Sequence, residues 1–393
     1  MAPTLPVRIS SVDAYRGFVM FLMMAEVLEF GSISKALPDS SFWAFLAYNQ
    51  DHVEWVGCSL HDLIQPSFSF LVGVALPYSI ASRMAKGQNF GAMFGHTIQR
   101  SLILIFLGIF LRSMHREQTN FTFEDTLTQI GLGYPVLFWL GFRTFRTQLI
   151  ALGTILVGYW LFFAVYPLPG ADFDYAAVGG TADWEHNLKG FAAHWNKNTN
   201  AAWAFDQWFM NLFPREKPFI RNGGGYSTLS FIPTLGTMVL GLLAGQWLKS
   251  DSAPMEKVKR FATLGVALLV VGSLLNWLGV CPNVKRIWTP TWVLFSGGWC
   301  FVLLAAFYWL VDIQGWRKAF IWLIIIGTNS IAAYVISHTI VEFIHHSIQI
   351  HVSQTYDQVF GITYESLVRG GLILLVEWLI LRWMYRNRIF VRI

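Results

Sequence analysis

Residues 49–73 read NQDHVEWVGCSLHDLIQPSFSFLVG and place two histidines, two aspartates and a glutamate directly before an apolar run. Ser59 and Asp62 stand three positions apart just ahead of that run, which is the spacing of a capping box, so the sequence predicts that a helix begins here. Asp62 then lies beside the positive end of the helix. His52 lies in the segment that leads into it.

The composition excludes an ordinary soluble protein. Of the 393 residues, 54% are hydrophobic and only 13% are charged, and the mean hydropathy is +0.47. A soluble fold would have too few polar side chains to cover its surface. Apolar runs of the length that a helix needs to cross the hydrocarbon layer recur along the whole chain. The predicted fold class is therefore all-α, a polytopic membrane helix bundle.

We predict about 10 transmembrane helices, within a range of 9 to 11, in a single domain that covers residues 1–393. The expected spans are residues 12–30, 61–82, 98–112, 126–142, 147–166, 227–248, 261–279, 290–311, 319–343 and 364–382. Gly241 and Gly245 predict a close helix contact of the small-xxx-small kind. Residues 167–226 contain no spanning run and predict a long functional loop on the extracytoplasmic side.

The basic residues predict the orientation. By this layout, 17 of the 28 lysines and arginines lie on one side of the membrane or at the helix ends there. The positive-inside rule makes that side cytoplasmic, and both termini lie on it. Because the basic residues form short clusters between apolar segments, the net charge of +5 indicates topology and gives no support to a nucleic-acid partner.

His52 leads the candidates for chemistry, since an imidazole can take a proton near neutral pH and the neighbouring Asp51 and Glu54 could orient it. The alternative is a surface-loop histidine without a task. Asp62, with His61 beside it, either caps the helix or faces a cavity. Glu26 and Glu29 end an apolar span, where a carboxylate is costly unless it is paired, protonated or in water, so we expect them to line a polar cavity.

Residues 319–343 carry a polar face inside an apolar span. Tyr334, His338 and Glu342 are spaced four residues apart and share one side of a helix, with Asn329 ahead of them. These groups either line a cavity or make hydrogen bonds between helices. No metal-binding motif accompanies them, the three cysteines are too few for a zinc site, and no glycine-rich phosphate loop is present, so we expect no metal and no familiar nucleotide cradle.

Six blocks of the sequence, in this order, resemble the heparan-α-glucosaminide N-acetyltransferase family and its bacterial relatives. They are SVDAYRGF (11–18), HVEWVGCSLHDLIQPSFSFLVG (52–73), TLTQIGLGY (126–134), GGGYSTLSFIPTLGTMVLGLLAG (223–245), KRIWTPTWVLFSGG (285–298) and GTNSIAAYVISH (327–338). The family's essential histidine stands ten residues before the aspartate of a D-L-x-x-P-x-F block, a spacing that His52 and Asp62 match. The chain departs from the lysosomal members in having Glu26 and Glu29 near the place of an amide side chain, and we expect no counterpart of their amino-terminal lumenal domain.

The resemblance implies a transmembrane acetyltransferase that moves an acetyl group from cytosolic acetyl-CoA to an amino sugar outside, in a bacterial inner membrane. The expected catalytic residues are His52, Asp62 and Glu26, with His52 as general base and an acetyl-carrying His52 as the alternative. Acetyl-CoA is expected at Arg16, Arg83, Arg100, Gln129, Asn329 and Ser330. The acceptor is expected at Glu29, Trp55, Tyr334 and His338.

The expected partners are acetyl-CoA, a glycan or amino-sugar acceptor and the lipid bilayer, with a homodimer as the oligomer to consider. The competing hypothesis is a sugar permease without chemistry, because a ten-helix bundle with aromatic outer loops also suits sugar stacking. The family match leaves the acceptor open, including whether it is an amine or a hydroxyl.

Overall fold

The computed structural model describes residues 9–391, and the secondary structure in that range is helical. Its α-helices are α1 (Ser10–Met24), α2 (Phe30–Ala36), α3 (Ser41–Gln50), α4 (Ile64–Ala85), α5 (Phe90–Ser113), α6 (Thr126–Leu140), α7 (Phe145–Ala164), α8 (Ala201–Phe209), α9 (Phe231–Lys249), α10 (Pro254–Trp277), α11 (Pro290–Phe307), α12 (Ile321–Thr328), α13 (Ser330–Thr339), α14 (Val341–His351) and α15 (Glu365–Arg386). No strand occurs in this part of the chain, where one isolated bridge joins Val56 to Val284. The predicted all-α class is confirmed.

Every predicted span contains a helix, but fewer than ten of these helices have the length and composition of a membrane span. Within residues 9–391, six helices are long and apolar enough, and the count reaches eight if each of two bent pairs forms one span. Helix α6 has 15 residues, fewer than the roughly 20 that a span needs. Helix α15 carries Arg369, Glu377 and Arg382 along its length. Arg8 and Arg392, which support the predicted orientation, lie outside the described residues.

Two predicted spans are broken. In the first, α1 ends at Met24 and a 3₁₀ turn (Ala25–Leu28) follows. The chain then bends by 43° into α2 at Glu29, whose φ is +46°. Helices α12 and α13 bend by 81° at Asn329. There the Asn329 amide donates to the carbonyl of Ile389 at 2.7 Å and its oxygen accepts from the backbone N–H of Val391 at 2.9 Å. The break is therefore fixed by the segment that follows α15.

Glycines allow the closest helix contacts. A Cβ atom at Gly241 of α9 would lie 1.9 Å from the carbonyl oxygen of Phe70 in α4, and one at Gly245 would lie 2.4 Å from that of Val74. No larger residue fits at such a separation, so the predicted small-xxx-small contact is confirmed and its partner is α4. Helices α1 and α12 meet in the same way, through Gly17 and Gly327.

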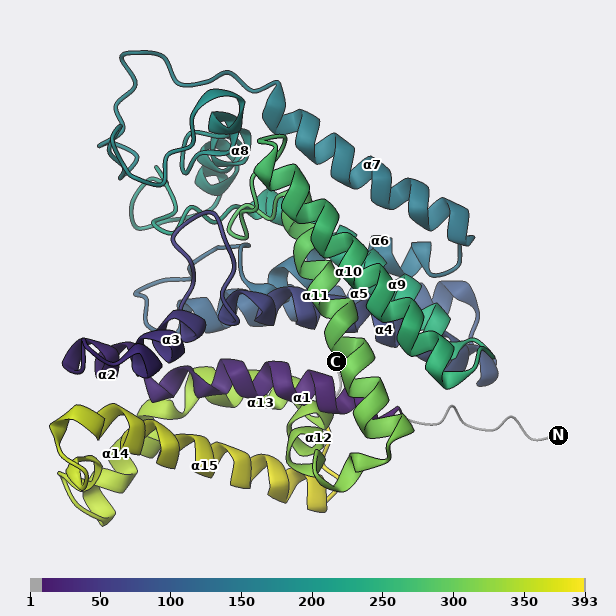
Figure 1. Ribbon diagram of the computed structural model, residues 1–393, viewed down its shortest axis with the longest axis vertical. Helices are drawn as coiled ribbons and strands as arrows, with labels where there is room; N and C mark the ends of the chain where they lie inside the picture. The colour runs from purple at the N-terminus through teal and green to yellow at the C-terminus, as the bar shows by residue number, and fades with distance from the viewer. Residues whose placement is uncertain (1–8, 392–393) are drawn as a thin grey trace.

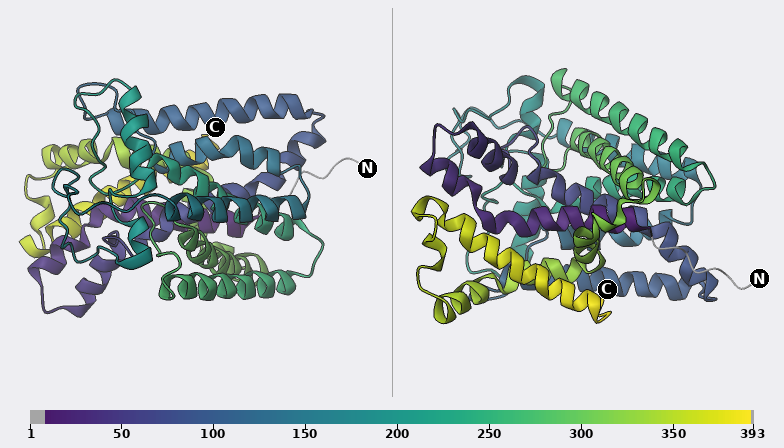
Figure 2. Two further views of the ribbon diagram at one scale, coloured as in Figure 1. Left: turned by 90° about the horizontal axis from the view of Figure 1, so that it is seen from above. Right: turned by 60° about the horizontal axis from the view of Figure 1, so that its bottom comes forward.

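The helices form two groups. Figure 1 shows α1, α12, α13, α14 and α15 on one side of the molecule and α7, α9, α10 and α11 on the other. The segment between α7 and α9 folds beside one end of the bundle, together with α2 and α3, as Figure 2 also shows. We call residues 165–226 the cap, and the end of the bundle that it covers the cap end. The cap is anchored by an apolar cluster in which Trp195 packs with Trp55, Phe163 and Val284.

Candidate active site

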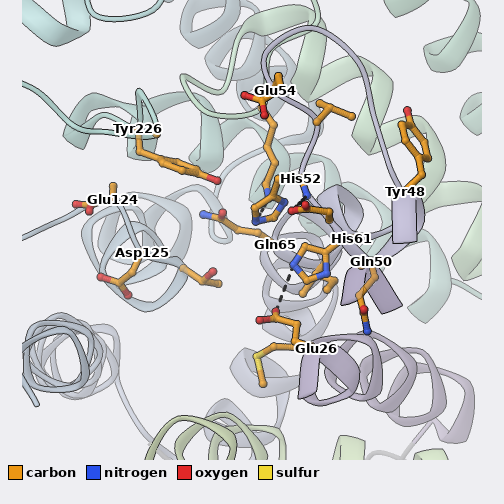
Figure 3. Close-up of a pocket in the computed structure, with 18 of the residues that line it drawn as sticks. Glu26, Tyr48, Gln50, His52, Glu54, His61, Gln65, Glu124, Asp125 and Tyr226 are labelled. Carbon is orange, nitrogen blue, oxygen red and sulfur yellow. Dashed lines mark hydrogen bonds and ion pairs between the residues drawn. The ribbon is translucent and has the colours of Figure 1, made fainter. Parts of the chain in front are cut away.

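A cavity of about 1220 Å³ opens among the helix ends at the cap end. Its walls come from the end of α1, from α2 and α3, from the start of α4, from the junction of α5 and α6, from α13 and from the segments before α9 and α11. Met20, Met23 and Phe68 contribute apolar surface to it. Figure 3 shows that the polar side chains His52, His61, Gln65 and Glu26 gather in the cavity from separate elements.

The position of His52 is set by Asp62. The Nδ1 atom of His52 lies 2.8 Å from Oδ1 of Asp62, whose side chain is buried. The other carboxylate oxygen accepts hydrogen bonds from the Ser59 N–H at 3.0 Å, the Ser59 hydroxyl at 3.1 Å and the Val53 N–H at 3.3 Å. The Asp62 N–H in turn donates to the Ser59 hydroxyl at 3.2 Å, so the predicted capping box is confirmed. Asp62 therefore fixes the start of the 3₁₀ turn (His61–Leu63) that leads into α4 and also holds the imidazole.

Lys285 completes this group and was missed by the sequence analysis as a site residue. Its side chain is buried, and its Nζ lies 3.3 Å from Oδ1 of Asp62 and 3.0 and 3.3 Å from the two ring nitrogens of His52. The isolated bridge between Val56 and Val284 holds the two loops together, with the Gly57 N–H donating to the Asn283 carbonyl at 3.1 Å. The available signal was that Lys285 opens one of the six matched blocks.

Arg286, the next residue, ties the same loop to the cap. Its guanidinium donates to the carbonyl of Gly224 at 2.9 Å and to that of Val53 at 3.2 Å. It also lies over the ring of Tyr226, 5.4 Å from the centroid. The segment that carries His52 is thus held between the cap and the loop before α11.

The surroundings of His52 favour its neutral form. Burial lowers the pKa of His52, the hydrogen bond to Asp62 opposes that effect, and the charge of Lys285 adds to it. The net result is a pKa below the ordinary histidine value. The hydrogen-bond network assigns the proton of the neutral ring to Nδ1, which donates to Asp62, and leaves the lone pair on Nε2. A ring in this state can accept a proton from a bound substrate.

A second pair lies next to the first. The Nε2 atom of His61 is 3.3 Å from Oε1 of Glu26, and the ring centroids of His61 and His52 are 4.5 Å apart. His61 is buried, whereas the Glu26 side chain is 54% exposed and faces the cavity. Glu26 can therefore contact a ligand directly while His61 holds it in place.

The predicted site residues divide into two groups. Those that line the cavity are Glu26, His52, Trp55, Tyr334 and His338, with Asp62 directly behind His52. Trp55 is almost fully buried and donates to the carbonyl of Trp195 at 3.1 Å, so it also anchors the cap. Those that do not line the cavity are Arg16, Glu29, Arg83, Arg100, Gln129, Asn329 and Ser330.

Several members of the second group have other partners. Glu29 pairs with Arg369 at 2.8 Å, and Arg100 donates to the Tyr134 hydroxyl at 3.2 Å. The Gln129 amide donates to the Ser227 carbonyl at 3.3 Å, and its oxygen accepts from the Thr234 hydroxyl at 2.9 Å. Gln129 therefore joins α6 to α9 and to the segment before it. Asn329 binds the segment after α15, as described above.

Across residues 9–391, no group of three or more histidine, cysteine, aspartate or glutamate side chains is arranged to hold a metal ion. At the cavity, His61 pairs with Glu26, and His52, Asp62 and Lys285 form a second group. The second group can act as an oriented base with a buried carboxylate behind it.

Comparison with known proteins finds distant relatives. No family model matches the chain. The heparan-alpha-glucosaminide N-acetyltransferase of Homo sapiens is 23% identical over an alignment of 430 residues, which covers 99% of this chain and 60% of that protein. The enzyme of the same name from Mus musculus is 23% identical over 374 residues, covering 85% of this chain and 54% of that protein. The chain thus spans little more than half the length of these curated relatives.

Proposed function

We propose that this chain is a transmembrane acetyltransferase that moves the acetyl group of acetyl-CoA to the amine of an amino sugar. The observation that carries the proposal is the His52 imidazole, held at 2.8 Å by the buried Asp62 on the wall of a cavity of about 1220 Å³. Burial lowers the pKa of His52, which favours the neutral ring that a base requires. The similarity to two N-acetyltransferases supports the reaction class. The size of the cavity supports two substrates, since single-ligand sites commonly occupy roughly 300 to 1,000 Å³.

In this reaction His52 is the general base. The Nδ1–H group stays hydrogen-bonded to Asp62. As the amine nitrogen bonds to the thioester carbonyl carbon, the amine loses a proton, and Nε2 accepts it. The carbon–sulfur bond then breaks, and the same proton passes from Nε2 to the departing thiolate. The products are an N-acetyl sugar and a free thiol. Asp62 stabilises the imidazolium between the two proton transfers.

The remaining lining residues suit the two substrates. Met20, Met23 and Phe68 offer an apolar surface to the thioester arm. Glu26 is exposed to the cavity and offers a carboxylate to the amine or the hydroxyls of the acceptor, and Tyr334 and His338 line the same space. Arg16, Arg83, Arg100, Gln129 and Ser330 stay predictions as contacts of the CoA nucleotide, and Glu29 and Trp55 stay predictions as contacts of the acceptor. Asn329, also predicted as a CoA contact, instead binds the backbone of Ile389 and Val391, and we propose a structural role for it.

We further propose that the cap end faces the extracytoplasmic side of a bacterial inner membrane. The helix ends and turns at the opposite end of the bundle carry Arg83, Lys86, Arg143, Arg146, Lys249, Lys257, Lys259 and Arg260. The positive-inside rule places such clusters in the cytoplasm. Acetyl-CoA then approaches from the basic end and the acceptor from the cap end.

The test is release of free thiol from acetyl-CoA by the purified protein in proteoliposomes, with a panel of acceptors that includes glucosamine and glucose. We expect thiol release that depends on the amino sugar and is lost in His52→Ala. His96→Ala is the matched control, because His96 is an exposed histidine of α5 that does not line the cavity. Uptake of the sugar without thiol release would replace the proposal with the permease.

A further inference from the structure

The surroundings of His52 contain more charge than a simple His–Asp pair needs. Asp51 accepts the His52 backbone N–H at 2.7 Å, Asp62 holds the ring, and the His61 ring lies beside it, tilted by 58°. Glu26 lies beyond His61. Lys285 contacts both the ring and Asp62, and Arg286 follows it in the same loop. Among these groups, the Lys285 ammonium brings a positive charge into direct contact with the imidazole.

Asp62 does not need Lys285 to satisfy its hydrogen bonds. One of its oxygens accepts from Ser59 and Val53, and the other accepts from His52. A buried lysine is costly, because its ammonium loses water and a single ion pair seldom recovers the whole loss. Burial accordingly lowers the pKa of Lys285, while the adjacent Asp62 opposes that effect. The buried Lys285 ammonium therefore destabilises the fold by its desolvation, yet it lies where its charge acts on His52.

The two neighbours act on the imidazole in opposite directions. The Asp62 carboxylate at 2.8 Å favours the protonated ring, as a carboxylate beside a histidine does in general. The ammonium of Lys285 at 3.0 Å from Nδ1 disfavours it. Since Nδ1 already donates to Asp62, the acceptors within reach of the Lys285 ammonium are the Asp62 carboxylate oxygen and Nε2 of His52, each at 3.3 Å. A positive charge this close to both ring nitrogens opposes protonation of the ring.

We propose that Lys285 is a positioning residue that keeps the His52 base unprotonated, so that Asp62 can fix the ring without also charging it. This inference rests on the proposed function, because it assigns a purpose to the neutral state of the base. It implies that the enzyme works at a more acidic pH than a His–Asp pair alone would allow. A structural alternative exists, in which Lys285 only holds the loop before α11 against Asp62.

The experiment compares Lys285→Met with Lys285→Arg. Met keeps the length of the side chain and removes the charge, whereas Arg retains the charge. The first readout does not depend on activity: it is the pH dependence of His52 modification by diethyl pyrocarbonate, which reacts with neutral imidazole, followed by mass spectrometry of the peptide. The second readout is the pH profile of kcat/KM for thiol release.

We expect Lys285→Met to move the midpoint of His52 labelling and the acid limb of kcat/KM to higher pH by about 1 to 3 pH units, the effect of one adjacent charge. Lys285→Arg should keep both close to those of the wild-type protein. Loss of thermal stability in Lys285→Met with both midpoints unmoved would overturn the inference and leave the structural alternative.

The two proposals fail separately. If the wild-type protein releases no thiol from acetyl-CoA, the proposed function fails, while the labelling midpoints still decide what Lys285 does to His52. If thiol is released and the midpoints do not differ between wild type and Lys285→Met, the role of Lys285 fails and the acetyltransferase stands. Where Lys285→Met does not fold, Lys285→Gln provides the neutral variant for the same two readouts.

Discussion

At the residue scale, the position of His52 depends on hydrogen bonds that other groups make. The Asp62 carboxylate is fixed by Ser59 and Val53 before it meets the ring, so the ring is held by an acceptor that cannot rotate away. This is the arrangement that general-base catalysis favours, because a base is effective only when its lone pair is aimed at the proton. The base is therefore positioned by the capping box that precedes the 3₁₀ turn (His61–Leu63) and α4.

The direct consequence is a loss of turnover in His52→Ala. We expect the rate of acetyl transfer to fall by about a hundred- to ten-thousand-fold, the usual cost of removing a general base. The fold should survive, because Asp62 and Lys285 remain paired at 3.3 Å without the ring. The checks are turnover and the thermal unfolding temperature of the purified variant. Retention of more than about a tenth of wild-type turnover would show that His52 is not the base.

At the element scale, the cap contains a buried acid that makes its packing sensitive to pH. Burial raises the pKa of Asp206 in α8 to about 7, although the Thr228 N–H donates to its carboxylate at 2.9 Å. Its other oxygen is buried without a partner in the described residues. The pKa of Asp206 in the folded protein lies above its unfolded value of 3.8. Protonation of Asp206 therefore stabilises the fold fully below pH 3.8, and this stabilisation is lost as the pH rises towards 7.

We therefore expect the unfolding temperature of the wild-type protein to fall between pH 5 and pH 8, and Asp206→Asn to flatten that fall. The effect on the free energy of unfolding is at most about 4 kcal/mol. Asp172→Asn is the control, because Asp172 is an exposed carboxylate in the same cap. Scanning fluorimetry of the three proteins at several pH values is the measurement. A slope that is equal in all three would contradict the assignment.

The break between α12 and α13 gives a second prediction at this scale. The sequence analysis expected Asn329 to line the cavity, but its side chain binds the backbone of Ile389 and Val391. We expect Asn329→Ala to lower the unfolding temperature, by the equivalent of about 1 to 3 kcal/mol for two buried hydrogen bonds. Activity per folded molecule should be preserved.

Asn387→Ala is the matched control for this prediction, since the Asn387 amide, just after α15, donates to a carbonyl of that helix four residues back, that of Trp383 at 2.9 Å. It should leave the unfolding temperature nearly unchanged. If Asn329→Ala has normal stability and a higher KM for acetyl-CoA, the structural role is wrong and Asn329 contacts acetyl-CoA.

The elements differ in how far local sequence determines them. The capping box at Ser59 and Asp62 and the contact at Gly241 and Gly245 were predictable, because both depend on residues three or four positions apart. The bend at Asn329 was not, because it depends on a backbone segment sixty residues further along the chain. Lys285 was missed for the same reason: its partner Asp62 lies far away in the sequence, and only the packing of two loops brings them together.

At the scale of the whole molecule, one end of the bundle carries the cap and the cavity, and the other carries most of the basic turns. If the cap end is extracytoplasmic, His52 equilibrates with the outer solution. Burial holds the pKa of His52 below the ordinary value of 6.5. The base therefore becomes protonated, and loses activity, only when the outer pH falls below 6.5.

In proteoliposomes with a fixed internal pH, we therefore expect the rate to decline as the external pH is lowered, with an acid limb below pH 6.5. The rate should respond little to internal pH when the external pH is held at 7.5. A rate that follows internal pH alone would place the cap end on the other side of the membrane.

The most direct measurement of the central claim uses the same vesicles, with radiolabelled acetyl-CoA trapped inside and glucosamine supplied only outside. We expect labelled N-acetyl sugar in the outer solution, formed by the wild-type protein and not by His52→Ala. Acetyl-CoA that stays intact while glucosamine enters the vesicles, or equal labelling by His52→Ala, would contradict that claim.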